Sequence, residues 1–148
     1  MTETNGILFL PSGRWRWRVD SVPGSSEEIL ELFEPGNATN KMQATLPFSW
    51  RQLDEDAFRD IASRPEVRLW LDESGILWRV TAVGPGTPFP FPLERRHLVF
   101  DSQQSWAGIV EFPGPAELAD LGNRELAELR NRVSDFGGRR RAYRLPTD

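Results

Sequence analysis

The feature that most constrains the fold is an internal similarity between the two halves of the chain. Residues 7–24 read ILFLPSGRWRWRVDSVPG, and residues 67–86 read VRLWLDESGILWRVTAVGPG. Each segment has an apolar run, a Ser-Gly pair, an alternating run that contains Trp-Arg-Val, and a loop with proline and glycine. Glycine supplies the positive φ that a tight hairpin turn needs. Each segment therefore predicts a β-hairpin.

The similarity continues into a second pair of strands in each half. Residues 29–36 are compared with residues 97–104, with Phe33 matched to Phe100. Turn-forming residues close this second pair in both halves, as expected for antiparallel neighbours. Short strand-rich segments also resemble one another by chance, which is the alternative to a duplication.

Each half is predicted to end in a helix. The first is expected to begin near Asp54, whose carboxylate suits the free N–H groups of a helix start, and to stop before Pro65. The second is expected to have Asn123 as its N-cap and to end at Gly137-Gly138.

These elements predict an α+β fold of two tandem ββββα repeats, with antiparallel sheets, two helices and pseudo-two-fold symmetry. The repeats are expected at residues 1–66 and 67–136, followed by a basic tail at residues 137–148. A four-stranded unit leaves its edges open, so the two repeats are expected to share one compact domain. The sequence leaves open whether they form one continuous sheet or pack face to face.

The alternating stretch RWRWRV indicates a strand with one buried and one solvated face. Trp17 recurs as Trp78, which indicates a core position. Arg18 recurs as Arg79, which favours a cross-strand pair with a carboxylate. The two arginines that do not recur are candidates for a contact special to the first half: Arg14 and Arg16.

The composition argues against several kinds of chemistry. The chain has no cysteine, which excludes disulfides, thiol catalysis and cysteine-ligated zinc. It has one histidine, His97, so a transition-metal site is not expected. No nucleophile, phosphate-loop or dinucleotide-binding motif is present in the sequence. We therefore expect neither an enzyme nor a cofactor, although an unrecognised pair of carboxylates would leave a hydrolase as an alternative.

The net charge and the hydropathy of the chain bear on two kinds of partner, nucleic acid and membranes. The formal net charge is −4, which disfavours general binding to nucleic acid, although a local basic patch is compatible with it. The sequence shows neither a signal peptide nor an apolar run of the roughly 20 residues that a membrane span needs. We expect a cytoplasmic, prokaryotic protein that does not bind membranes.

Two further segments are candidates for binding a partner. Residues 83–97 read VGPGTPFPFPLERRH, which predicts a stiff proline-rich loop that either presents its phenylalanines to a partner or folds them over the core. The basic tail offers arginines to an acidic protein surface or nucleic acid, or to the acidic stretch at residues 27–34 of this chain. The candidate residues are Phe89, Phe91, Arg95 and Arg96 in the loop, and Arg139, Arg140 and Arg141 in the tail.

The sequence thus favours a non-catalytic protein-interaction module, such as a small accessory or adaptor subunit of a larger bacterial assembly. A different class, single-stranded nucleic-acid binding through arginine and aromatic side chains on a sheet face, is the alternative.

Overall fold

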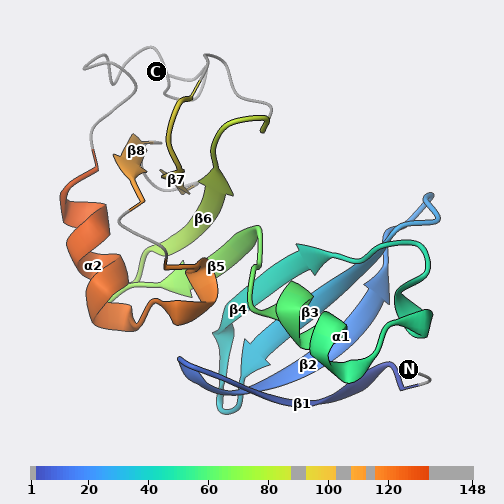
Figure 1. Ribbon diagram of the computed structural model, residues 1–148. Helices are drawn as coiled ribbons and strands as arrows, with labels where there is room; N and C mark the ends of the chain where they lie inside the picture. Colours follow the sequence, from blue (N-terminus) through green and yellow to red (C-terminus); the bar gives the residue numbers. More distant parts are fainter. Residues whose placement is uncertain (1–2, 88–92, 103–107, 113–115, 134–148) are drawn as a thin grey trace. The chain divides into compact units, whose positions relative to one another are not determined.

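The computed structural model describes residues 3–87, 93–102, 108–112 and 116–133 (Figure 1). These residues form eight β-strands, two α-helices and two short 3-10 helices, and the strands pair in an antiparallel fashion. The chain divides into two compact units: Met1–Arg68 with Glu117–Asp120, and Leu69–Ala116 with Leu121–Asp148. The predicted α+β class is confirmed. None of the helices in the described ranges is both long and apolar enough to cross a bilayer.

The first unit contains a four-stranded antiparallel meander, in which strands adjacent in sequence are adjacent in the sheet. Its elements are β1 (Asn5–Leu10), β2 (Gly13–Ser21), β3 (Glu28–Glu34), β4 (Asn37–Thr45), the 3-10 helix η1 (Trp50–Gln52) and α1 (Glu55–Ala62). The predicted β1–β2 hairpin is present, but its loop is Pro11-Ser12, one residue before the expected Ser-Gly pair: Leu10 lies opposite Gly13, which has a φ of 135°. A residue with a Cβ is strained at this φ, which accounts for the glycine.

The alternation predicted for β2 is confirmed. Trp15 and Trp17 are buried, while the three arginines that alternate with them are exposed. Leu30 and Leu32 of β3 are fully buried on the same face of the sheet. The other face carries Arg18, which lies directly opposite Glu31 and forms an ion pair with it at 3.0 Å. The cross-strand carboxylate expected for Arg18 is therefore present.

Helix α1 covers the face of the sheet that carries the tryptophans (Figure 1). The Phe58 ring lies 4.9 Å from the Trp17 ring, centroid to centroid. The helix begins as predicted, because the Asp54 carboxylate accepts a hydrogen bond from the Ala57 N–H at 2.8 Å. It also ends before Pro65, with Ser63 as its C-cap. One face of the sheet is thus occupied by the unit's own helix.

A buried arginine completes the first unit. Arg68 is 2% exposed, and its guanidinium donates to Asn40 Oδ1 at 3.1 Å and to the Leu118 carbonyl at 2.8 Å. The same guanidinium lies 5.7 Å from the centre of the Trp15 ring. Ala119, beside Leu118, is part of the apolar core that contains Trp15. A segment distant in sequence therefore closes the first unit.

The second unit has the same order of elements. Its elements are β5 (Val67–Leu71), β6 (Leu77–Val83), β7 (His97–Asp101), β8 (Gly108–Glu111) and α2 (Asn123–Asn131). The 3-10 helix η2 (Leu118–Asp120) lies between β8 and α2 in sequence. Helix η2 and the first two residues of β5 group with the first unit. The rings of Trp70 and Trp78 both contact Phe100 edge-on, at 6.4 and 6.0 Å. Leu126 and Leu129 are buried on one face of α2.

Two details of the sequence analysis are wrong. The N-cap of α2 is Gly122 rather than Asn123, because the Glu125 carboxylate accepts the Gly122 N–H at 2.7 Å and supplies the capping interaction from within the helix. The helix also stops at Asn131, well before the glycine pair that was expected to end it, which lies outside the described residues.

A further error is the alignment of Phe33 with Phe100. The register pairs Arg18 with Glu31 in the first unit and Arg79 with Asp101 in the second. Phe33 therefore lies on the face opposite the core, where the Arg18 guanidinium stands 5.5 Å from its ring centre. Phe100, by contrast, is fully buried. Phe33 and Phe100 were matched by residue type alone. A strand has two faces, and a shift of one residue exchanges them, so this match paired an uncovered-face residue with a core residue.

Candidate interaction surface

Arg14 and Arg16 lie on the face of the first unit's sheet that α1 does not cover. Both side chains are exposed, and both alternate with buried tryptophans along β2. The register places Phe9 of β1 opposite Arg14 and Ile7 of β1 opposite Arg16. Cross-strand partners share a face of the sheet, so these four side chains form one contiguous strip.

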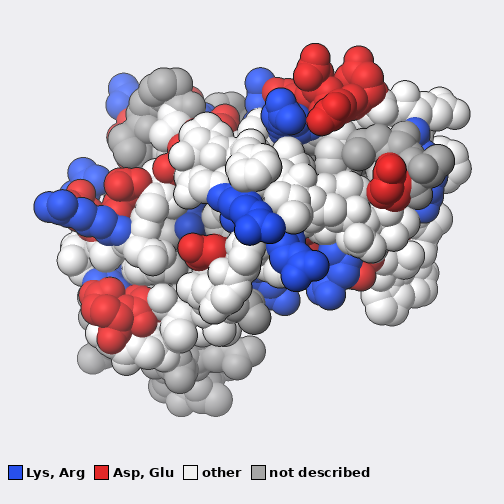
Figure 2. Space-filling view, turned by 90° about the horizontal axis from the view of Figure 1, so that it is seen from below, with Lys and Arg blue, Asp and Glu red and all other residues white. Residues whose placement is uncertain are grey.

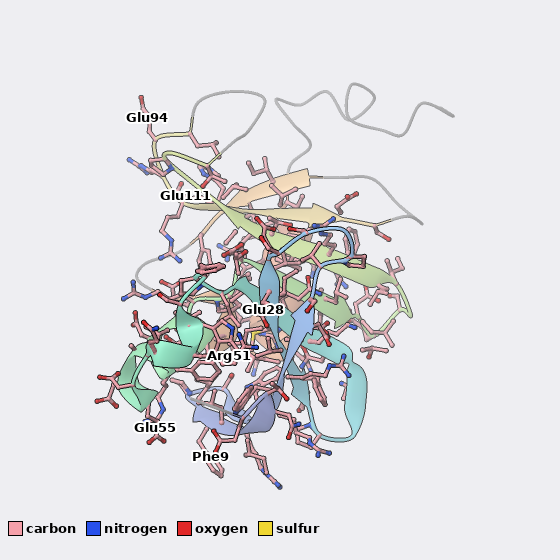
Figure 3. All side chains as sticks on the ribbon, turned by 90° about the vertical axis from the view of Figure 1, so that its right-hand side faces the viewer. Phe9, Glu28, Arg51, Glu55, Glu94 and Glu111 are labelled. Atoms are coloured by element: carbon pink, nitrogen blue, oxygen red, sulfur yellow. The ribbon has the colours of Figure 1, made fainter. Side chains whose placement is uncertain are left out.

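The two apolar members of the strip are unusually exposed. Phe9 is 71% exposed and Ile7 is 47% exposed. Figure 3 shows the Phe9 side chain projecting away from the strand that carries it. We call the strip formed by Ile7, Phe9, Arg14 and Arg16 the β1–β2 surface.

The arginines of the β1–β2 surface differ from their neighbour Arg18 in their ion pairing. Arg18 pairs with Asp20 at 3.1 Å and with Glu31 at 3.0 Å. Within the described ranges, Arg14 and Arg16 have neither a carboxylate at ion-pair distance nor a side-chain hydrogen bond. Among the residues that the structure describes, these two positive charges therefore have no counter-charge. In the view from below, some Lys and Arg side chains stand among uncharged surface and others stand beside Asp and Glu (Figure 2).

The strip continues toward the middle of the sheet. Phe33 of β3 lies opposite Arg16, and Lys41 of β4 lies opposite Phe33. Ile7, Arg16, Phe33 and Lys41 thus form a row across all four strands on the uncovered face. Apolar and cationic side chains alternate along this row.

A pair of interacting carboxyl groups lies beside this row. The interaction with Asp20 is the largest influence that lowers the pKa of Glu31, to about 2, and Arg18, Gln43 and Lys41 act in the same direction against the effect of burial. The same interaction with Glu31 raises the pKa of Asp20. Arg18 donates hydrogen bonds to both groups, and Lys41 Nζ lies 3.7 Å from Glu31, so two cations face the two carboxyl groups. This arrangement stabilises the sheet and commits both carboxylates to Arg18 and Lys41.

Arg95 and Arg96, two predicted site residues of the second unit, both interact with other residues of that unit. Arg95 forms an ion pair with Glu111 at 3.1 Å, and its carbonyl oxygen lies 2.8 Å from His97 Nδ1. The Arg96 guanidinium donates to the Ala116 carbonyl at 2.9 Å and stacks 4.5 Å from the Phe112 ring centre. Arg96 thus fixes the end of β8, whereas Arg95 remains largely exposed.

Five of the candidate residues lie outside the described ranges: Phe89, Phe91, Arg139, Arg140 and Arg141. Within those ranges, no group of three or more His, Asp or Glu side chains is arranged to hold a metal ion.

Ile7 and Phe9 were not among the residues predicted from the sequence to bind a partner. Their segment, ILFL, is uniformly apolar, so alternation alone does not indicate which residues face solvent. The signal lies in the turn: a two-residue Pro11-Ser12 loop places Phe9 opposite Arg14 and Ile7 opposite Arg16. The solvated face of β2 then assigns the exposed face of β1.

Comparison with protein-family models, with curated proteins and with solved structures gives no match.

Proposed function

We propose that the chain is a non-catalytic protein-interaction module that docks a partner protein on the β1–β2 surface. A small accessory subunit of a larger cytoplasmic assembly in a bacterium is the form of this function that the sequence favours. The observation that carries the proposal is the strip of exposed Ile7 and Phe9 beside Arg14 and Arg16, whose charges have no counter-charge among the described residues.

The composition of the strip supports this function. Aromatic side chains and arginines are enriched in protein interfaces, where an apolar centre excludes water and the guanidinium forms oriented hydrogen bonds. A phenylalanine 71% exposed on a strand contributes little to the stability of its own fold. Its burial by a partner removes up to about 150 Å² of apolar surface from water.

The interacting carboxyl groups of Asp20 and Glu31 favour a binding function over hydrolysis. A hydrolase needs one carboxyl as an acid and another that is free to act as a base or nucleophile. Here Glu31 is 7% exposed and is engaged by Arg18, Lys41 and Gln43. A carboxylate held by three donors is a structural acceptor rather than a reactive group.

We also propose that the two ββββα units arose by duplication, and this explains why the surface belongs to the first unit. The shared order of elements supports the duplication, as do the buried Trp17 and Trp78 in equivalent Trp-Arg-Val triplets. In the register of these triplets, Arg14 corresponds to Gly75 and Arg16 to Leu77. The second unit lacks both cations, so it is not expected to bind the same partner.

The test compares the proteins captured by three forms of the immobilised chain. The surface variant is Arg14→Gln with Arg16→Gln. The control is Arg59→Gln with Arg64→Gln, which removes the same charge from exposed positions of the first unit that already have ion-pair partners. We expect a protein, identified by mass spectrometry, that the wild type and the control retain and the surface variant loses.

The measurement has a clear negative outcome. If the surface variant and the wild type capture the same proteins in the same amounts, the β1–β2 surface does not bind a partner and the proposal is wrong. Circular dichroism of all three forms shows whether the substitutions leave the fold intact.

A further inference from the structure

The backbone of β1 has a free hydrogen-bonding edge. Val19 N–H donates to the Thr4 carbonyl at 2.9 Å, which makes Thr4 and Val19 a hydrogen-bonded pair of the β1–β2 ladder. Such pairs alternate with non-hydrogen-bonded pairs in an antiparallel ladder. The register therefore assigns Gly6 and Leu8 to the bonds with β2. The N–H and C=O groups of Asn5, Ile7 and Phe9 point away from β2.

No other described strand of the first unit pairs with this edge, because β1 is the outermost strand of its meander. Proteins usually protect such edges with charged side chains, proline or a bulge. The β1 sequence, NGILFL, contains no charge and no proline, and its pairing with β2 runs without a bulge. The edge is thus competent to accept another strand.

The free backbone groups and the exposed side chains belong to the same residues. Ile7 and Phe9 direct their side chains to the uncovered face and their N–H and C=O groups to the open edge. A strand added at this edge would lie about 4.8 Å from β1 and place every second side chain beside Ile7 and Phe9. Arg14 and Arg16 lie one strand further, about 9–10 Å from the added strand. A glutamate and an arginine side chain together span this distance.

We propose that the partner docks by strand addition: an extended segment of another protein, with carboxylates at alternate positions, pairs with β1. This inference rests on the proposed function and names the chemistry of the partner. Main-chain hydrogen bonds to Ile7 and Phe9 provide affinity, and pairing of carboxylates with Arg14 and Arg16 provides specificity.

Other occupants fit less well. A second copy of this chain would bring another uncharged β1, which offers no carboxylate to the two arginines and adds two more of them to the same face. The C-terminal residues 134–148 carry four arginines, so they have the wrong charge for this site. Single-stranded nucleic acid offers phosphates, but it does not match the alternating backbone donors and acceptors of a strand edge.

The first experiment needs no variant. An acetylated and amidated seven-residue peptide that alternates valine and glutamate is titrated into the full chain, and amide hydrogen exchange is followed by NMR. We expect new protection at Ile7 and Phe9, with little change at Gly6 and Leu8, which are already bonded to β2. The same peptide with lysine in place of glutamate serves as the charge control and is expected to give no protection.

The second experiment separates the edge from the side chains. Ile7→Pro removes an N–H that points outward, so it blocks an incoming strand without removing a β1–β2 hydrogen bond. Ile7→Thr keeps this N–H and is the matched control. We expect the proline variant to weaken peptide binding at least tenfold more than the threonine variant. Arg14→Gln with Arg16→Gln is expected to weaken it about three- to thirtyfold, the effect of two exposed ion pairs.

The outcomes distinguish this inference from the function on which it rests. Absence of alternating protection, or equal binding by the proline and threonine variants, would overturn strand addition. If the arginine variant still loses the captured protein in that case, docking through the β1–β2 surface stands. Binding of a ten-residue oligothymidylate in place of the peptide, or dimerisation through β1 in analytical ultracentrifugation, would also overturn the proposed occupant.

Discussion

Asp72 holds the β5–β6 hairpin and α2 together, and its replacement by asparagine is a sharp test of the second unit. The Asp72 side chain is 1% exposed. Its Oδ1 accepts the N–H groups of Ser74 and Ile76 at 2.8 and 2.9 Å. Its Oδ2 accepts Trp78 Nε1 at 2.8 Å and Arg130 Nη1 at 2.7 Å. All four donors depend on one carboxylate.

The expected cost follows from this geometry. Asparagine keeps an oxygen for the backbone N–H groups of Ser74 and Ile76. Its amide nitrogen, however, faces the donors of Trp78 and Arg130, so two hydrogen bonds to a charged group are lost. Such bonds contribute about 1.5–3 kcal/mol each. Arg130 retains Glu73 as a partner at 3.1 Å, which limits its share. We expect Asp72→Asn to lower the free energy of unfolding by about 3–5 kcal/mol.

The assay is guanidinium-induced unfolding followed by tryptophan fluorescence and circular dichroism. Asp54→Asn is the matched control, because asparagine caps a helix as well as aspartate does and the site is exposed. We expect the control to change the free energy of unfolding by less than about 0.5 kcal/mol. A loss below 1 kcal/mol for Asp72→Asn would refute the reasoning, since it would mean that the four donors do not depend on the charge.

The same substitution predicts a change in pH dependence. Burial raises the pKa of Asp72, but the hydrogen bonds from Trp78, Ile76, Ser74 and Arg130 outweigh it and hold the pKa below its ordinary value. A lowered pKa in the folded state stabilises the protein above the unfolded-state pKa of about 3.9, and this stabilisation is lost as the pH falls below that value. The Asp72→Asn variant should therefore lose less stability than the wild type between pH 5 and pH 3.

Three further predictions concern the first unit. Trp17→Ala should lower the free energy of unfolding by about 3–5 kcal/mol, because Trp17 is 5% exposed; a loss below 1 kcal/mol in denaturant titration would contradict its burial. Phe9→Ser should change the same free energy by less than about 0.5 kcal/mol, and a loss of 2 kcal/mol would show that Phe9 packs within the fold. Glu31→Gln should lower the pKa of Asp20, because the interaction that raises it is lost; an unchanged carboxyl titration by NMR would show that Glu31 is not the cause.

Local patterns were sufficient to predict most of the individual elements. The period of two in RWRWRV assigned both faces of β2, and the Asp54 cap and Pro65 bounded α1. These features depend on neighbouring residues, so they can be read from a short window of sequence. The cap of α2 was missed because Glu125, three residues after the cap, supplies the interaction that a side chain at the cap usually provides.

Features that depend on distant residues could not be predicted. Nothing in the segment VRLWL distinguishes Arg68, which is buried, from the exposed arginines of β2, because its partners are Asn40 and the Leu118 carbonyl. The β1–β2 surface could be predicted from the sequence only in part. The exposure of Arg14 and Arg16 was predicted from the alternation in β2, whereas that of Ile7 and Phe9 required the register of the hairpin.

The contact between Arg68 and Leu118 has a consequence for the order in which the protein folds during synthesis. The carbonyl that accepts the Arg68 guanidinium lies 50 residues later in the chain. At a synthesis rate of about 5–20 residues per second, several seconds pass before this acceptor leaves the ribosome. Until then, the guanidinium cannot be satisfied as it is in the complete fold, and full burial of Arg68 is costly. The meander of the first unit can form early from local hairpins, but it reaches its final stability only when most of the second unit has been made.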